Sequence, residues 1–76
     1  MKLIEGKKYI LFYKTWSKPD TFTYEGYREC GYNCDRCGRV RKRLHIFYQG
    51  NIKTGNLTQV AKYGSECLKH IKINSV

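Results

Sequence analysis

Hydrophobic and polar positions follow a period of two over much of the chain. Residues 7–16 are rich in aromatic and other β-favouring side chains, and residues 21–29 alternate aromatic with polar positions. Both patterns are typical of β-strands. The turn signal at residues 17–20 contains Pro19, which presets the backbone for a turn. We therefore expect an N-terminal β-hairpin, bent or bulged at Gly26.

A third strand is expected over residues 39–48, whose two faces separate at period two. One face is expected to be mostly core, and the other is a cationic row that ends in a histidine and an aromatic ring. The expected core face carries Val40, Lys42, Leu44, Ile46 and Tyr48, and the cationic face carries Arg39, Arg41, Arg43, His45 and Phe47.

The last third of the chain is expected to form a strand and then a helix. Residues 50–56 read as a long hairpin tip, and residues 57–63 as the returning strand. Ser65 is a typical helix N-cap residue. A short helix is expected over residues 66–73, with its apolar positions three apart and turned toward the hairpin.

The length of 76 residues allows one domain. A chain of about this size buries only ~60% of the surface that its unfolded form exposes, so a metal, a cross-link or a partner is expected to add stability. The 41% of hydrophobic residues exclude intrinsic disorder. No apolar run approaches the ~20 residues of a membrane span, and residues 1–6 do not resemble a signal peptide. The expected compartment is the cytoplasm.

The four cysteines, at positions 30, 34, 37 and 67, are more consistent with metal binding than with disulfides. A cytoplasmic compartment is reducing. Four cysteines in 76 residues, or roughly 5%, is also below the ~8–10% of disulfide scaffolds.

Two ligand pairs predict one structural zinc ion, Cys34-x-x-Cys37 and Cys67-x-x-His70. Structural zinc takes four tetrahedral ligands of these types. Gly38 lets the backbone fold round the metal after the first pair. Cys67 and His70 are three residues apart, so on a helix they share one face. A knuckle, a hairpin and a helix that supplies the last ligands is the layout of a treble-clef finger.

The fourth ligand has alternatives. Cys30 precedes Cys34 by a short loop and can replace His70 in the ligand set. Water or another oxygen ligand is a third choice.

Two motifs resemble a treble-clef zinc domain that recurs in proteins of bacteriophages and other bacterial mobile elements. They are C-D-x-C-G at residues 34–38, followed by basic residues, and G-S-x-C-L-K at residues 64–69. The resemblance covers residues 33–71 and implies zinc at Cys34, Cys37 and Cys67. It also implies a phage-type protein in the bacterial cytoplasm.

The fold class expected from these patterns is α+β. Residues 1–76 are expected to form a single zinc-binding domain. In it, an N-terminal β-hairpin over residues 1–30 packs beside a treble-clef finger over residues 31–76.

Basic residues exceed acidic ones by 15 to 6, which gives a formal net charge of +9. A sequence pI near 9.6 is typical of a nucleic-acid-binding domain. Arginine forks suit phosphate groups, and aromatic rings stack on bases. The expected DNA- or RNA-binding residues are Arg36, Arg39, Arg41, Lys42, Arg43, His45 and Phe47.

A protein-interaction module is the alternative function. The same arginines can pair with carboxylates on an acidic surface of a host protein such as RNA polymerase or a nuclease. An enzyme is not expected, because four ligands leave no open zinc position and no catalytic motif or carboxylate pair is visible. No small-molecule substrate and no membrane partner are expected.

Overall fold

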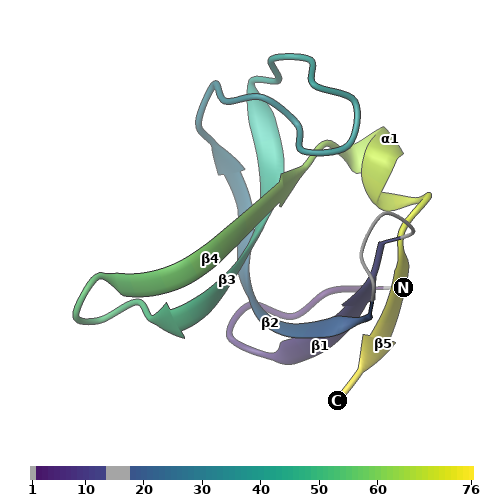
Figure 1. Cartoon of the computed structure of the whole chain (residues 1–76). Helices are drawn as coiled ribbons and strands as arrows, with labels where there is room; N and C mark the ends of the chain where they lie inside the picture. The colour runs from purple at the N-terminus through teal and green to yellow at the C-terminus, as the bar shows by residue number, and fades with distance from the viewer. Residues whose placement is uncertain (1, 14–17) are drawn as a thin grey trace.

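The chain folds into one five-stranded antiparallel sheet with a single helical turn, as a computed structural model of residues 2–13 and 18–76 describes it. The strand order is β4-β3-β2-β1-β5, and the sheet is strongly curved (Figure 1). Its elements are β1 (Lys8–Phe12), β2 (Asp20–Glu29), β3 (Arg43–Asn51), β4 (Asn56–Tyr63), α1 (Ser65–Leu68) and β5 (Lys72–Ser75). The protein is therefore mostly β, which corrects the expected α+β class.

The N-terminal hairpin and its bulge are confirmed. β1 pairs with β2, with Tyr9 opposite Phe22. In the β2–β3 ladder Tyr24 pairs with Phe47 and Gly26 with Ile46, so one residue of β2 is left over between them. Gly26 has a φ of +136°, which glycine adopts without the strain of a side chain. The end of the expected first strand, residues 14–16, and the first residue of the expected turn, residue 17, lie outside the described residues.

The helix expected over residues 66–73 is wrong in length. The one-turn α1 ends at Leu68, and its N-cap residue is Gly64 rather than Ser65. The chain then turns and extends as β5, where Ile73 pairs with Leu11 of β1. Backbone pairing with β1 and β-branched side chains outweigh helix propensity here. No helix in the described part of the chain is long and apolar enough to cross a membrane.

Aromatic side chains fill the inner side of the curved sheet. The Tyr63 ring at the end of β4 lies 6.1 Å from the Tyr13 ring just after β1, although β1 and β4 are not neighbours in the sheet. Phe47 stacks obliquely on Tyr24 at 5.1 Å. The largest fully buried side chains are Tyr9, Leu11, Phe22, Leu44, Phe47, Tyr63 and Cys34. The core is thus mostly rings contributed by four strands.

The expected division of residues 39–48 into a buried core face and an exposed cationic face is wrong. Phe47, expected on the cationic face, is fully buried, because it pairs with Tyr24 of β2 and Ala61 of β4 on the inner side. Of the expected core face only Leu44 is buried, and the rest is half-buried or exposed. Leu44 and Phe47 are both buried although they lie three residues apart, so a strict period of two does not describe the burial along this strand.

Candidate metal centre and basic surface

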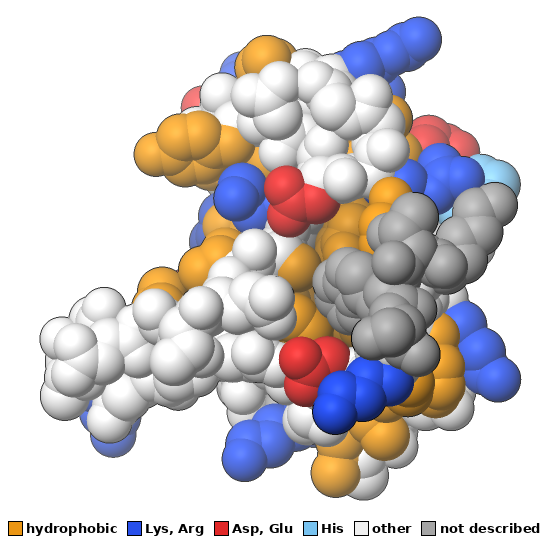
Figure 2. Space-filling view, viewed as in Figure 1, with side chains coloured by type: hydrophobic (Ala, Val, Ile, Leu, Met, Phe, Trp, Pro, Cys, Tyr) orange, Lys and Arg blue, Asp and Glu red, His pale blue; other side chains and the backbone are white. Residues whose placement is uncertain are grey.

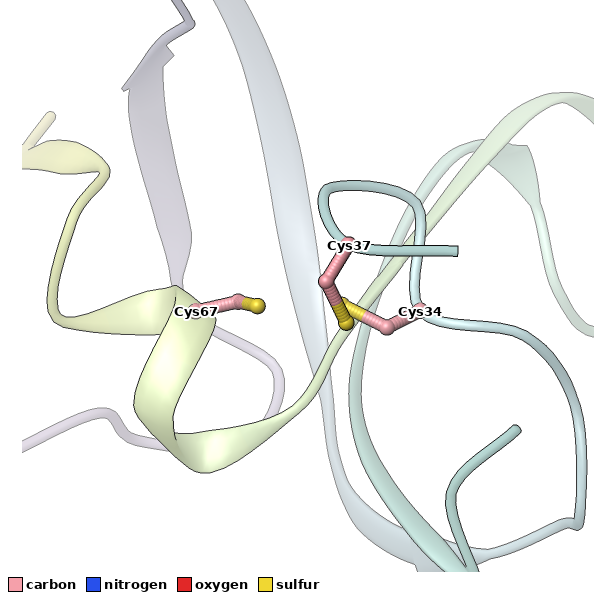
Figure 3. A group of neighbouring side chains, drawn as sticks. All are labelled: Cys34, Cys37 and Cys67. Atoms are coloured by element: carbon pink, nitrogen blue, oxygen red, sulfur yellow. The ribbon is translucent and has the colours of Figure 1, made fainter. Parts of the chain in front are cut away.

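Three cysteine side chains converge at one end of the sheet (Figure 3). Cys34 and Cys37 lie on the loop between β2 and β3, and Cys67 projects toward them from α1. Their three sulfur atoms all lie within 4.8 Å of one another. Thiolates at about 2.3 Å from a tetrahedral zinc ion are about 3.8 Å apart, so a small contraction suffices to bind one ion. The cluster can therefore hold a metal.

The loop that carries the first two cysteines is a tight knuckle. The Gly38 N–H donates to the Cys34 carbonyl at 2.8 Å, and the Cys34 N–H donates to the Arg39 carbonyl at 2.9 Å. The Asn33 side-chain amide also donates to the Gly38 carbonyl at 2.7 Å. Gly38 has a φ of +74°, which confirms the reason for a glycine after the second cysteine.

The knuckle is attached to β4 through Asp35. The Asp35 N–H donates to the Lys62 carbonyl at 2.8 Å, and the Lys62 N–H donates to the Asp35 carboxylate at 2.7 Å. Lys62 stands five residues before Cys67 in the chain. This pair of hydrogen bonds therefore brings the knuckle beside α1 and fixes the distance between the two halves of the cysteine cluster.

Backbone N–H groups favour a thiolate at Cys34. Burial disfavours the charged sulfur, but hydrogen bonds from the backbone of Cys37, Gly64 and Arg36 outweigh it and lower the Cys34 pKa to about 7. The Gly64 N–H lies 3.4 Å from this sulfur. A thiolate is the form that binds a metal, so Cys34 is prepared for it near neutral pH.

Cys67 has the opposite tendency. Burial, followed by hydrogen bonding with the Cys34 and Cys37 thiols, raises the pKa of Cys67, and the Arg36 side chain partly offsets this. The Arg36 guanidinium lies 3.9 Å from the Cys67 sulfur. A bound metal cation would stabilise the Cys67 thiolate and so lower the pKa of this thiol.

Neither expected fourth ligand lies in the cluster that the described residues form. His70 is exposed, because α1 ends at Leu68 and His70 stands in the following turn, with its N–H donating to the Cys67 carbonyl at 3.0 Å. Cys30 is half-buried and packs against the aromatic core. The structure thus brings three of the expected ligands together, Cys34, Cys37 and Cys67.

The five cations expected to bind nucleic acid are all exposed, but they do not form a strand row. β3 begins at Arg43, and the chain before it is irregular apart from a single bridge between Val40 and Asn33. These cations therefore lie on the knuckle loop and in the segment that leads from it into β3. In the described part of the chain, the ion pairs join Arg28 to Glu5 and Glu25, and Lys69 to Glu66. Arg36, Arg39, Arg41, Lys42 and Arg43 form no such pair there.

His45 and Phe47 do not belong to the exposed basic surface. Phe47 is buried, as described above. The His45 ring is held between the Tyr24 hydroxyl, 2.8 Å from Nδ1, and the Ser65 hydroxyl, 3.4 Å from Nε2. Burial lowers the pKa of His45, which favours the neutral ring at physiological pH.

Tyr27 is a surface aromatic residue that the sequence patterns did not single out. It pairs with His45 across β2 and β3, and the two rings stack with their centroids 4.3 Å apart. The Tyr27 residue is 41% exposed. Its position just after the bulge glycine was the available signal, because a bulge redirects the next side chain.

No family model, curated protein or solved structure matches this chain. The resemblance to the treble-clef domain therefore rests on the two cysteine motifs alone. The functional assignment has to come from the geometry of the cysteine cluster and the charges around it.

Proposed function

We propose that this chain is a non-catalytic nucleic-acid-binding protein whose basic surface is held in place by one zinc ion. The observation that carries the proposal is the position of the five cations of residues 36–43 around the cysteine cluster, all exposed and without carboxylate partners in the described chain. Cations that no carboxylate neutralises are available for an external anion.

Zinc is the metal that best suits three thiols. Thiolates are soft ligands, and a reducing compartment favours zinc over disulfide formation. We propose that the knuckle, the β3–β4 hairpin and α1 form a treble-clef finger built into the larger sheet. His70 is the proposed fourth ligand, because it is only three residues from Cys67 and a rearranged turn would bring its ring to the ion.

Phosphate is the anion that best suits these side chains. Arginine donates two parallel hydrogen bonds to a phosphate, and four of the five cations are arginines. Figure 2 shows Lys and Arg side chains spread around the visible face, with several Asp and Glu side chains among them. A net charge of +9 adds long-range attraction to a polyanion. The proposed setting is a bacterial cytoplasm, as the resemblance implies.

The test is fluorescence anisotropy with labelled single-stranded and duplex oligonucleotides over a range of salt concentrations. Each phosphate contact contributes about −0.9 to the slope of log K against log salt on duplex DNA and about −0.7 on single strands. Replacing Arg39, Arg41 and Arg43 by alanine together should weaken binding and make this slope shallower by roughly 2 to 3.

The matched control removes the same charge elsewhere on the surface. Lys8, Lys18 and Lys53 are exposed and lie outside residues 36–43. Their triple alanine variant should retain most of the affinity and bind the same amount of zinc. Equal losses in both triple variants would contradict a defined binding surface, and no salt-dependent binding by the unaltered chain would contradict the proposal itself.

A protein partner is the second candidate, and two apolar side chains favour it. Tyr32 is 61% exposed and Val40 is 66% exposed, and both lie beside the cations. A mixed apolar and cationic surface suits an acidic protein, such as a host RNA polymerase or nuclease. A stoichiometric complex with a host protein, together with no oligonucleotide binding, would support this role instead.

A further inference from the structure

A cleft of about 360 Å³ lies between the end of the basic segment and α1. Tyr27, Arg41, Lys42 and Arg43 line it from the β2–β3 side, and residues 64–67 line it from the α1 side. Its volume is within the range of small-ligand clefts. The cleft thus combines three cations and an aromatic ring beside the cysteine cluster.

The Tyr27 ring is supported from behind. One of its faces packs on His45, with the two ring planes 27° apart, and His45 in turn stacks on Tyr24 with centroids 6.0 Å apart. Tyr24 is buried in the core. The ring therefore loses little conformational freedom when a planar ligand stacks on it, because its orientation is already fixed.

Cations stand within reach of any group attached to such a ligand. The Arg43 guanidinium lies over the Tyr27 ring, 5.9 Å from its centre, so a base that stacks on that face would displace it toward the neighbouring phosphate. Arg41 and Lys42, which precede Arg43 in the chain, line the same side of the cleft. A planar base with a phosphodiester beside it matches this combination of ring and guanidinium groups.

We infer that this cleft binds one unpaired base of a single-stranded nucleic acid, stacked on Tyr27, with the neighbouring phosphates on Arg41 and Arg43. This inference rests on the proposed function and names the form of nucleic acid. A duplex exposes its phosphates but keeps the faces of its bases stacked on one another, so it cannot use the Tyr27 ring. A single strand uses both the ring and the guanidinium groups.

Glu66 gives the bound nucleotide a direction. Its carboxylate lines the α1 side of the cleft and pairs with Lys69 at 3.4 Å. Lys69 offsets the Glu66 charge, so this side attracts a phosphate less than the side of Arg41 and Arg43 does. The base edge is therefore the part of the nucleotide that faces α1.

The experiment measures anisotropy of labelled ten-nucleotide single strands and a hairpin duplex with the full chain loaded with zinc. Tyr27→Leu should weaken single-strand binding about tenfold or more, because each stacked base contributes at that scale, and it should leave the salt slope and duplex binding unchanged. Tyr27→Phe retains the ring and should bind like the unaltered chain. Tyr32→Leu is the matched control, since Tyr32 is exposed outside the cleft.

A second measurement needs no variant and so does not depend on folding of Tyr27→Leu. A single strand with abasic sites retains its phosphates and lacks bases, so the unaltered chain should bind it about tenfold or more weakly than the intact strand. Equal affinity for both strands, or for Tyr27→Leu and the unaltered chain, would overturn the stacking cleft. Because the arginine triple variant would still lose affinity in that case, the proposed function would stand. If the unaltered chain bound no oligonucleotide at all, both the stacking cleft and the proposed function would be overturned.

Discussion

The two ends of the molecule differ in how much apolar surface they bury. On the inner side of the sheet, Tyr9, Phe22, Phe47 and Tyr63 are almost fully buried and pack ring against ring. From residue 30 to residue 42, by contrast, Cys34 alone is buried. Hydrophobic burial therefore stabilises the first region, while residues 30–42 are mostly exposed turns, from which Cys34 alone is buried in the core. An end with so little apolar contact needs another source of stability, and a bound metal would supply one.

The largest expected effect tests the cysteine end. Cys67→Ser removes the sulfur atom that α1 contributes to the cluster of three, so the chain should lose its stoichiometric zinc. Structural zinc contributes roughly 10–16 kcal/mol in finger peptides, which exceeds the stability of most small domains. We expect the domain to unfold, measured by zinc content and by circular dichroism.

The control for that change is Cys30→Ser. Cys30 is half-buried and lies outside the cluster of three sulfur atoms. The variant should retain one zinc ion and a cooperative unfolding transition. A Cys67→Ser protein with normal thermal stability and no zinc would contradict a structural metal.

The next effect tests the aromatic end. Phe47→Ala leaves a cavity between Tyr24, Ala61 and Tyr63, and we expect it to reduce the free energy of unfolding by about 3–5 kcal/mol. Chemical denaturation with zinc present measures this loss. Zinc stoichiometry should not change, because Phe47 supplies no ligand atom to the cluster of three sulfur atoms. A variant that loses both stability and zinc would show that the two ends do not act separately.

A smaller effect is expected at the hairpin that projects from the sheet. Gly50 has a φ of +104°, and an added Cβ would clash with the Asn56 carbonyl oxygen. Gly50→Ala should therefore reduce the free energy of unfolding by about 1–3 kcal/mol. Gly55→Ala is the comparison, since its φ is also positive but its Cβ meets open space. A larger loss at Gly55 than at Gly50 would contradict this account of the hairpin.

The smallest effect is a dependence on pH through His45. Burial lowers the His45 pKa in the folded chain, so below the ordinary value of about 6.5 the unfolded chain binds the proton first. Stability is therefore complete above about pH 6.5 and falls as the pH decreases toward the folded pKa, by at most about 1.4 kcal/mol per pH unit. Thermal unfolding from pH 7.5 to 5.5 measures this loss.

His45→Gln is the control for that titration. Both proteins lose stability in acid as the thiols take up protons, but the variant lacks the additional loss from the imidazole. The difference between the two melting temperatures should therefore change as the pH falls. Parallel curves for the two proteins would contradict a buried neutral His45.

The sequence predicted the local features better than their arrangement. The cysteine spacing, the glycine of the knuckle and the bulge at Gly26 each depend on a few neighbouring residues, and the structure contains all three. The treble-clef assignment and the nucleic-acid function stay predictions. The first depends on the path of the whole chain around the metal and the second on a partner molecule, and residue patterns show neither.

The failures come from contacts between distant residues. The helix over residues 66–73 ends early because β5 pairs with β1, some 60 residues away in the chain. Phe47 faces inward together with its cross-strand partners, the buried Tyr24 of β2 and Ala61 of β4. His70 leaves the cluster for the same reason as the helix, since the turn before β5 redirects it. Local periodicity contains no information on any of these pairings.

The central claim is that Cys34, Cys37 and Cys67 hold one zinc ion. X-ray absorption spectroscopy at the zinc edge of the purified chain tests it directly. We expect one zinc ion per chain with three sulfur ligands at about 2.3 Å and one nitrogen or oxygen ligand at about 2.0–2.1 Å. His70→Ala should change only the nitrogen or oxygen shell. A shell with fewer than three sulfur atoms, or a chain that binds no stoichiometric zinc, would contradict the claim.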